Sequence, residues 1–104
     1  MKQYKVYLPL NYNDGQPIPR EEIDKVRNRL ADKFGGATIS PLSAPYKGPW
    51  KYGGVEYVDN IVIMEVIADE AAPTQNFFSE LKTQLERDLG QHAILITSHS
   101  IEVI

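Results

Sequence analysis

Residues 55–68 read VEYVDNIVIMEVIA and include the longest strongly apolar run of the chain, Ile61 to Ala68. Within that run the odd and the even positions are both largely apolar, a pattern typical of a central strand. The stretch is longer than an ordinary strand of ~3–10 residues. We therefore expect a bulge or bend at Asp59-Asn60 that divides it.

The residues before this stretch predict a hairpin. Gly53-Gly54 separates it from residues 50–52, and a two-residue glycine turn favours tight antiparallel pairing. Further back, residues 37–40 begin a strand. Prolines at positions 41, 45 and 49 allow only an edge strand or an irregular excursion between the two.

Helix and strand patterns flank this central part on both sides. Residues 4–10 alternate as a first strand, and residues 92–98 form a last strand of buried type. Two helices complete the order. The first has an apolar stripe at Ile23, Val26, Leu30 and Phe34 and ends at Gly35-Gly36, and the second covers residues 74–89 and ends at Gly90.

This order of elements predicts an α+β fold, the ferredoxin-like β-α-β-β-α-β sandwich. Right-handed crossovers give an antiparallel sheet with strand order 4-1-3-2 and both helices on one face. A chain of 104 residues has room for one core, so we expect a single domain over residues 1–104.

The most informative part of the predicted fold is the sheet face that no helix covers. In residues 61–68 both faces are largely apolar, although the helices cover only one of them. An uncovered apolar face usually marks an interface. We expect a homo-oligomer, a dimer or trimer, that packs through this face. The alternative is that the C-terminal tail or the proline-rich excursion folds over it.

Composition restricts the classes of function. The chain has no cysteine and no continuous apolar run of signal-peptide type, which favours a cytoplasmic protein without a membrane span. A net charge of −3 argues against binding of nucleic acid. No known metal-ligand spacing or nucleotide-loop motif is present, so no metal and no cofactor is predicted.

Residues 46–56 form the candidate binding segment. They interleave aromatic rings with ammonium groups and end in a carboxylate, and the residues concerned are Tyr46, Lys47, Trp50, Lys51, Tyr52 and Glu56. Aromatic faces beside lysines suit a nucleotide or an acidic peptide. The alternative is that the rings seal the open sheet face while the lysines protect an edge strand.

Two residues are candidates for acid–base chemistry. His92 opens the last strand, where Glu56 is a possible orienting carboxylate. Strands two and four are the predicted edges, roughly 14 Å apart at ~4.8 Å per strand. His92 and Trp50 should therefore not touch within one subunit. Glu65 interrupts an apolar face, either as an acid of raised pKa or as a salt-bridge partner of Lys5.

Several short marks lie in order along the chain: Asp14-Gly15, Phe34-Gly35-Gly36-Ala37-Thr38 and Gly48-Pro49-Trp50. Together they resemble a family of small uncharacterised bacterial ferredoxin-like proteins with Phe-Gly-Gly-x-Thr and Gly-x-Trp marks. The resemblance covers residues 6–97 and implies the fold but no activity. In architecture alone the chain is similar to the PII and CutA-type trimers, and PII-type proteins bind nucleotides in clefts between subunits.

These observations favour a non-catalytic homo-oligomeric module that binds a small ligand or protein partner at the 46–56 segment. The alternative is a small enzyme with His92 or Glu65 as acid or base, in a cavity between subunits or on the sheet face.

Overall fold

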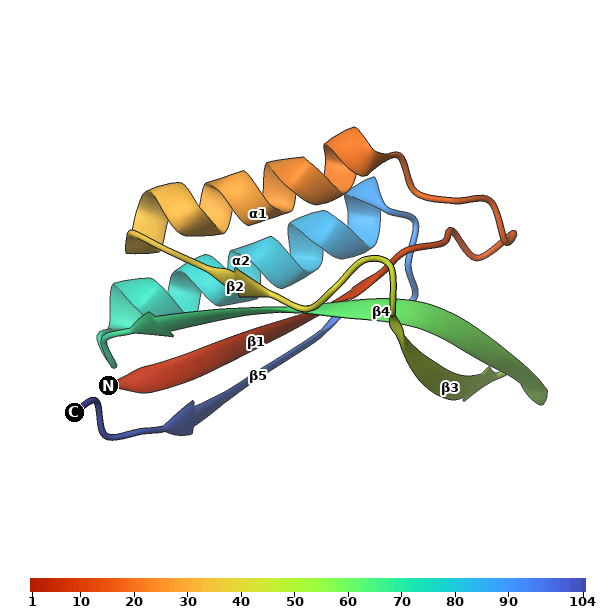
Figure 1. Cartoon of the computed structure of the whole chain (residues 1–104). Helices are drawn as coiled ribbons and strands as arrows, with labels where there is room; N and C mark the ends of the chain where they lie inside the picture. The colour runs from red at the N-terminus through yellow and green to blue at the C-terminus, as the bar shows by residue number, and fades with distance from the viewer.

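The computed structural model describes all residues, 1–104. The elements in chain order are β1 Lys2–Pro9, α1 Arg20–Phe34, β2 Thr38–Ile39, β3 Tyr46–Tyr52, β4 Val55–Ala68, α2 Ala72–Asp88 and β5 Leu95–Ser100. Both helices lie on one face of an antiparallel sheet, and the two termini meet at one end of it (Figure 1). The predicted α+β class is confirmed. Neither helix combines the length and the apolar composition needed to cross a membrane.

The core fills the layer between the helices and the sheet. The apolar stripe of α1 is buried at Ile23, Val26 and Leu30, as its spacing predicts. The helix ends where Gly35 adopts a left-handed φ of 81°, a backbone conformation that glycine takes without a Cβ penalty. Alternate strand residues such as Val6 and Met64 complete the core from the sheet side.

The predicted sheet of four strands needs correction in the number of its strands. The sheet has five strands, with the order β2-β4-β1-β5 and with β3 also paired to β4. The physical reason is that the second predicted strand is interrupted by proline-rich chain, because proline cannot donate to a ladder. Its two halves, β2 and β3, pair with different parts of β4.

The sequence predicted a bulge or a bend at Asp59-Asn60, and the bulge is absent. Strand β4 runs unbroken for 14 residues because two sets of partners support it in succession. Residues 55–61 pair with β3, and residues 61–68 pair with β1, whose last residue Pro9 lies opposite Ile61. The other residues of β4, 55–60, therefore project beyond the end of β1.

The projecting part of β4 and β3 form the β3–β4 hairpin. Its turn is Gly53-Gly54, with φ values of 60° and 79°, which suits the two-residue turn that the sequence predicts. Two-stranded ribbons twist more strongly than wide sheets. The hairpin accordingly bends away from the plane of the sheet, on the side opposite the helices (Figure 1).

Candidate functional site

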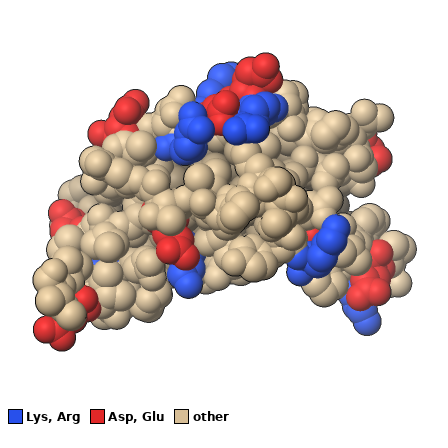
Figure 2. Space-filling model, viewed as in Figure 1, with Lys and Arg blue, Asp and Glu red and all other residues tan.

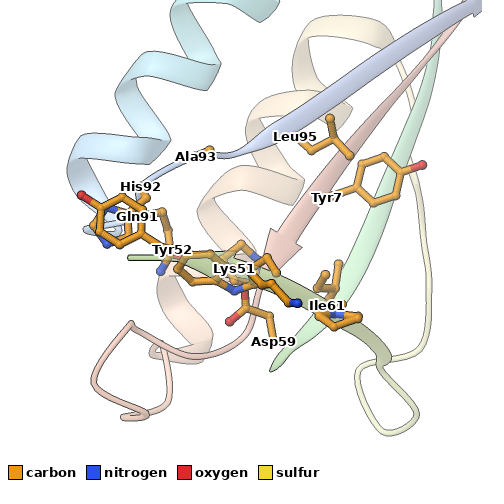
Figure 3. Close-up of a pocket in the computed structure, with 13 residues that line it drawn as sticks. Tyr7, Lys51, Tyr52, Asp59, Ile61, Gln91, His92, Ala93 and Leu95 are labelled. Carbon is orange, nitrogen blue, oxygen red and sulfur yellow. The ribbon is translucent and has the colours of Figure 1, made fainter. Parts of the chain in front are cut away.

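A cavity of about 610 Å³ lies on the open sheet face, where the β3–β4 hairpin bends toward the start of β5. Its lining comes from β1, β3, β4 and the segment before β5: Tyr7, Pro9, Gly48, Pro49, Trp50, Lys51, Tyr52, Asp59, Ile61, Gln91, His92, Ala93 and Leu95. Tyr52 and His92 lie together at one end, and Tyr7 and Leu95 lie at the other (Figure 3).

Aromatic stacking builds one wall of the cavity. The Tyr52 ring stacks on the His92 ring at 4.0 Å between centroids, and Trp50 meets His92 edge-on at 5.8 Å. Trp50 also stacks on its cross-strand partner Tyr57 at 4.5 Å. The expectation that His92 and Trp50 do not touch within one subunit was therefore wrong. It assumed that the hairpin lies flat at the sheet edge, whereas the hairpin extends past β1 and bends across the open face.

The loop that carries His92 is fixed on both sides. Upstream, the buried amide of Gln91 donates to the backbone carbonyls of Asn11 and Leu89, at 3.3 and 3.1 Å. Downstream, the backbone N–H of Ile94 donates to the Glu86 carboxylate at 2.8 Å. Because Gln91 and Ile94 are both held, the backbone of His92 between them is held where its ring can face the hairpin.

Asp59 is the acidic residue of the lining. It is half-buried, and burial raises the pKa of its carboxyl, while the nearby Trp50 indole N–H opposes that effect. The indole N–H is itself buried and makes no hydrogen bond of ordinary geometry. Gly48, opposite Asp59 in the ladder, has no side chain, and a Cβ there would collide with the Ile61 side chain.

Glu65 lies on the same open face but not in the lining. Its carboxylate is 3.9 Å from the Lys5 ammonium and accepts a hydrogen bond from the Gln3 amide at 3.1 Å. The ion pair to Lys5 was one of the two readings that the sequence left open. Both partners are about one-third exposed, so the pair contributes little to stability.

The candidate binding segment divides into two groups. Trp50, Lys51 and Tyr52 line the cavity, as does the acid–base candidate His92. Tyr46, Lys47 and Glu56 do not line it. Lys47 donates instead to the Asn60 side chain. Glu56 lies opposite Lys51 in the exposed part of the hairpin, near the turn.

Nine of the 13 lining residues were not among the sequence candidates, and they include the side chains of Tyr7, Asp59, Ile61 and Leu95. A usable signal was present in the alternation of strands. Asp59 and Ile61 share a face of β4 with Glu65, and Tyr7 lies opposite Leu95 on the open face of β1. The local pattern does not show that the hairpin bends over this face, which is what makes these residues a wall.

The fold and the site together describe a small α+β protein with an aromatic cavity on its open sheet face. No protein-family model and no curated protein matches the sequence. Among solved structures the chain is similar to a phage SAM lyase in complex with S-methyl-5′-thioadenosine, with a TM-score of 0.65 and 16% identity over 95% of this chain and 80% of that one. The same kind of phage enzyme in its apo state matches with a TM-score of 0.64 and 18% identity, over 94% and 78%.

These comparisons correct the functional prediction. The non-catalytic binding module was the wrong choice, because the fold that the chain shares is that of an enzyme. They favour the alternative of a small enzyme.

Proposed function

We propose that this protein is a lyase for an S-adenosyl sulfonium compound, with S-adenosylmethionine as the reference substrate. The observation that carries the proposal is the aromatic cavity beside His92, on a fold shared with a phage SAM lyase. At about 610 Å³ the cavity is in the size range of ligand sites of this kind.

The lining suits the two parts of such a substrate. The faces of Trp50 and Tyr52 suit stacking of an adenine base, which any aromatic ring supports. The same faces attract a cation such as a sulfonium. Asp59 supplies a negative charge in the same wall.

The reaction follows from the chemistry of the product. Release of S-methyl-5′-thioadenosine requires that the bond between sulfur and the amino-acid chain breaks, with its electron pair retained by sulfur. As this bond breaks, the four-carbon fragment either loses the proton of the adjacent carbon and forms a double bond, or forms a bond to its own carboxylate. His92 is the imidazole at the cavity and is the candidate base for the first route. The second route needs no base, and an unchanged rate in His92→Ala would favour it.

The test is incubation of the purified protein with S-adenosylmethionine, with S-methyl-5′-thioadenosine measured by chromatography and mass spectrometry. Tyr52 and Tyr46 offer a matched pair, because they belong to the same strand and are 55% and 57% exposed. Loss of one stacked ring in Tyr52→Ala should raise the apparent KM about tenfold. Tyr46 lies outside the cavity, so Tyr46→Ala should have the apparent KM of the wild type. Absence of thioadenosine from the wild-type reaction would refute the proposal.

We further propose that the topology is ferredoxin-like and that copies of the chain assemble through the open sheet face. The first is supported by the two helices on one face of the sheet, and the second by the exposed apolar side chains Leu95 and Ile67 on the other face.

A further inference from the structure

The cavity wall contains a single carboxylate, that of Asp59, and it has no cationic partner in the chain. Asp59 forms no salt bridge within 4.0 Å, and the donor that acts on it is the neutral Trp50 indole N–H, which compensates the charge only in part. A carboxylate partly removed from water is costly unless a cation or donor compensates it. Glu65, on the same face of β4, is compensated by Lys5 and Gln3.

The surroundings of Asp59 direct its charge into the cavity. Gly48, opposite on β3, offers no side chain to cover the carboxyl group, and Ile61, two residues along β4, is apolar. Lys51 also contributes to the lining, but its side chain is exposed, so water and salt screen its charge. Figure 3 places Asp59 and Ile61 along the hairpin side of the cavity.

We propose that Asp59 determines specificity for charge: its carboxylate selects a ligand that carries a positive centre over a neutral thioether of the same shape. This inference rests on the proposed function and goes beyond it by assigning the discrimination to one residue. The sulfonium supplies the missing cation. When the carbon–sulfur bond breaks and sulfur retains the electron pair, the sulfonium becomes a neutral thioether. The attraction to Asp59 is then lost, so the same residue that favours substrate binding favours release of the thioadenosine.

Acidification should weaken the binding of a cationic ligand more than that of a neutral one. Burial already favours the protonated Asp59 carboxyl, so this residue loses its charge at a higher pH than an ordinary aspartate. The other titratable groups around the cavity are Lys51 and Tyr52 of β3, His92 before β5 and Tyr7 of β1. A protonated His92 would also disfavour binding of a cation. The contribution of Asp59 is therefore the part of the pH dependence of cation binding that disappears in Asp59→Asn.

The test compares three probes by the fluorescence of Trp50, the only tryptophan in the chain. Sinefungin carries an ammonium in place of the sulfonium and is not cleaved, whereas S-adenosylhomocysteine and S-methyl-5′-thioadenosine are neutral at sulfur. In Asp59→Asn we expect sinefungin to bind about tenfold more weakly, while both thioethers stay within about twofold of wild type. Glu56→Gln removes an exposed charge from the same strand outside the cavity and should change none of the three.

A second variant at position 59 distinguishes loss of the charge from loss of folding. Asp59→Glu retains the charge and should retain the preference for sinefungin, although with altered affinity. Equal weakening of all three probes in Asp59→Asn, or no change, would overturn the inference and leave the proposed function standing. If no probe binds to the wild-type protein, the proposed function fails as well.

Discussion

Tyr4 combines a well-packed ring with a hydroxyl group that has no hydrogen-bond partner. Its side chain is 4% exposed, and its ring stacks on Phe78 with centroids 4.0 Å apart. The hydroxyl group is buried without a hydrogen-bond partner. Burial raises the pKa of this phenol, and the charges of Asp69 and Glu70 raise it further. The ring therefore stabilises the core while the hydroxyl group opposes it.

We expect Tyr4→Phe to raise the free energy of unfolding by about 1 kcal/mol, because it removes an unsatisfied buried donor and keeps the ring. Urea denaturation monitored by circular dichroism measures the change. Tyr7→Phe, on the opposite sheet face and only half-buried, is the matched control and should have no comparable effect. A destabilised Tyr4→Phe protein would mean that the hydroxyl group is satisfied in solution.

At the scale of elements, helix α2 is attached to the start of β5 by a compact polar cluster. The Glu86 carboxylate accepts hydrogen bonds from the Lys82 ammonium at 2.7 Å and from the Ile94 backbone N–H at 2.8 Å. Lys82 also donates to the Ile94 carbonyl. Both backbone groups of Ile94 are thereby satisfied outside the ladder.

This cluster should make stability depend on pH. Hydrogen bonding to Lys82, then to the Ile94 backbone, lowers the pKa of Glu86. A lowered folded-state pKa contributes stability above the unfolded value, roughly 4.3, and that contribution is lost as the pH falls through the folded value. We expect Glu86→Gln to have a lower melting temperature than the wild type near neutral pH. On acidification the melting temperature of the variant should fall by less than that of the wild type.

Thermal unfolding followed between about pH 2.5 and 7 brackets the titration of ordinary carboxylates. Glu80→Gln is the control, since Glu80 is exposed on the same helix and makes no salt bridge. Asp69 also has a lowered pKa, through Thr74 and the Ala71 backbone, so some acid sensitivity should persist in Glu86→Gln. Identical pH profiles for wild type and Glu86→Gln would argue against this role of Glu86.

The β3–β4 hairpin is the element that departs furthest from the sequence prediction. Its glycine turn follows from local chemistry, and so does its pairing. Its position does not, because it depends on how far β4 extends beyond Pro9, the last residue of β1. That offset brings Trp50 and Tyr52 to His92.

At the scale of the whole molecule, charge is unevenly distributed. In the view of Figure 2 charged side chains lie over the helices, on the hairpin and at the end where the termini meet. The surface between them is largely uncharged, apart from adjacent acidic and basic groups in the lower middle of the view. The open sheet face itself exposes apolar residues, among them Leu95 at 57% and Ile67 at 45%. An apolar surface of this kind favours association.

We expect the protein to migrate as a dimer or trimer in size-exclusion chromatography with light scattering. Ile67→Lys places a charge on the open face away from the cavity and should shift the mass toward that of one chain. Val103→Lys places the same charge in the exposed tail and should leave the mass unchanged. A wild-type protein with the mass of a single chain would contradict assembly through this face.

Local patterns in the sequence were sufficient for the helices, the glycine stops, the extended conformation of residues 55–68 and the division of these residues between two faces. Each of these depends on neighbours within a few positions, through hydrogen-bond periodicity, side-chain alternation and the left-handed conformation of glycine. The candidate residues Trp50, Lys51, Tyr52 and His92 were also identified in this way. The local patterns did not show that residues 55–68 form one unbroken strand.

Only the tertiary structure decided that these residues meet, and that Tyr7, Asp59 and Leu95 complete the cavity. The register that sets Pro9 opposite Ile61 fixes how much of β4 is left to twist as a two-stranded ribbon. Strand ends and ribbon curvature arise from packing between segments far apart in the chain, so no local pattern specifies them.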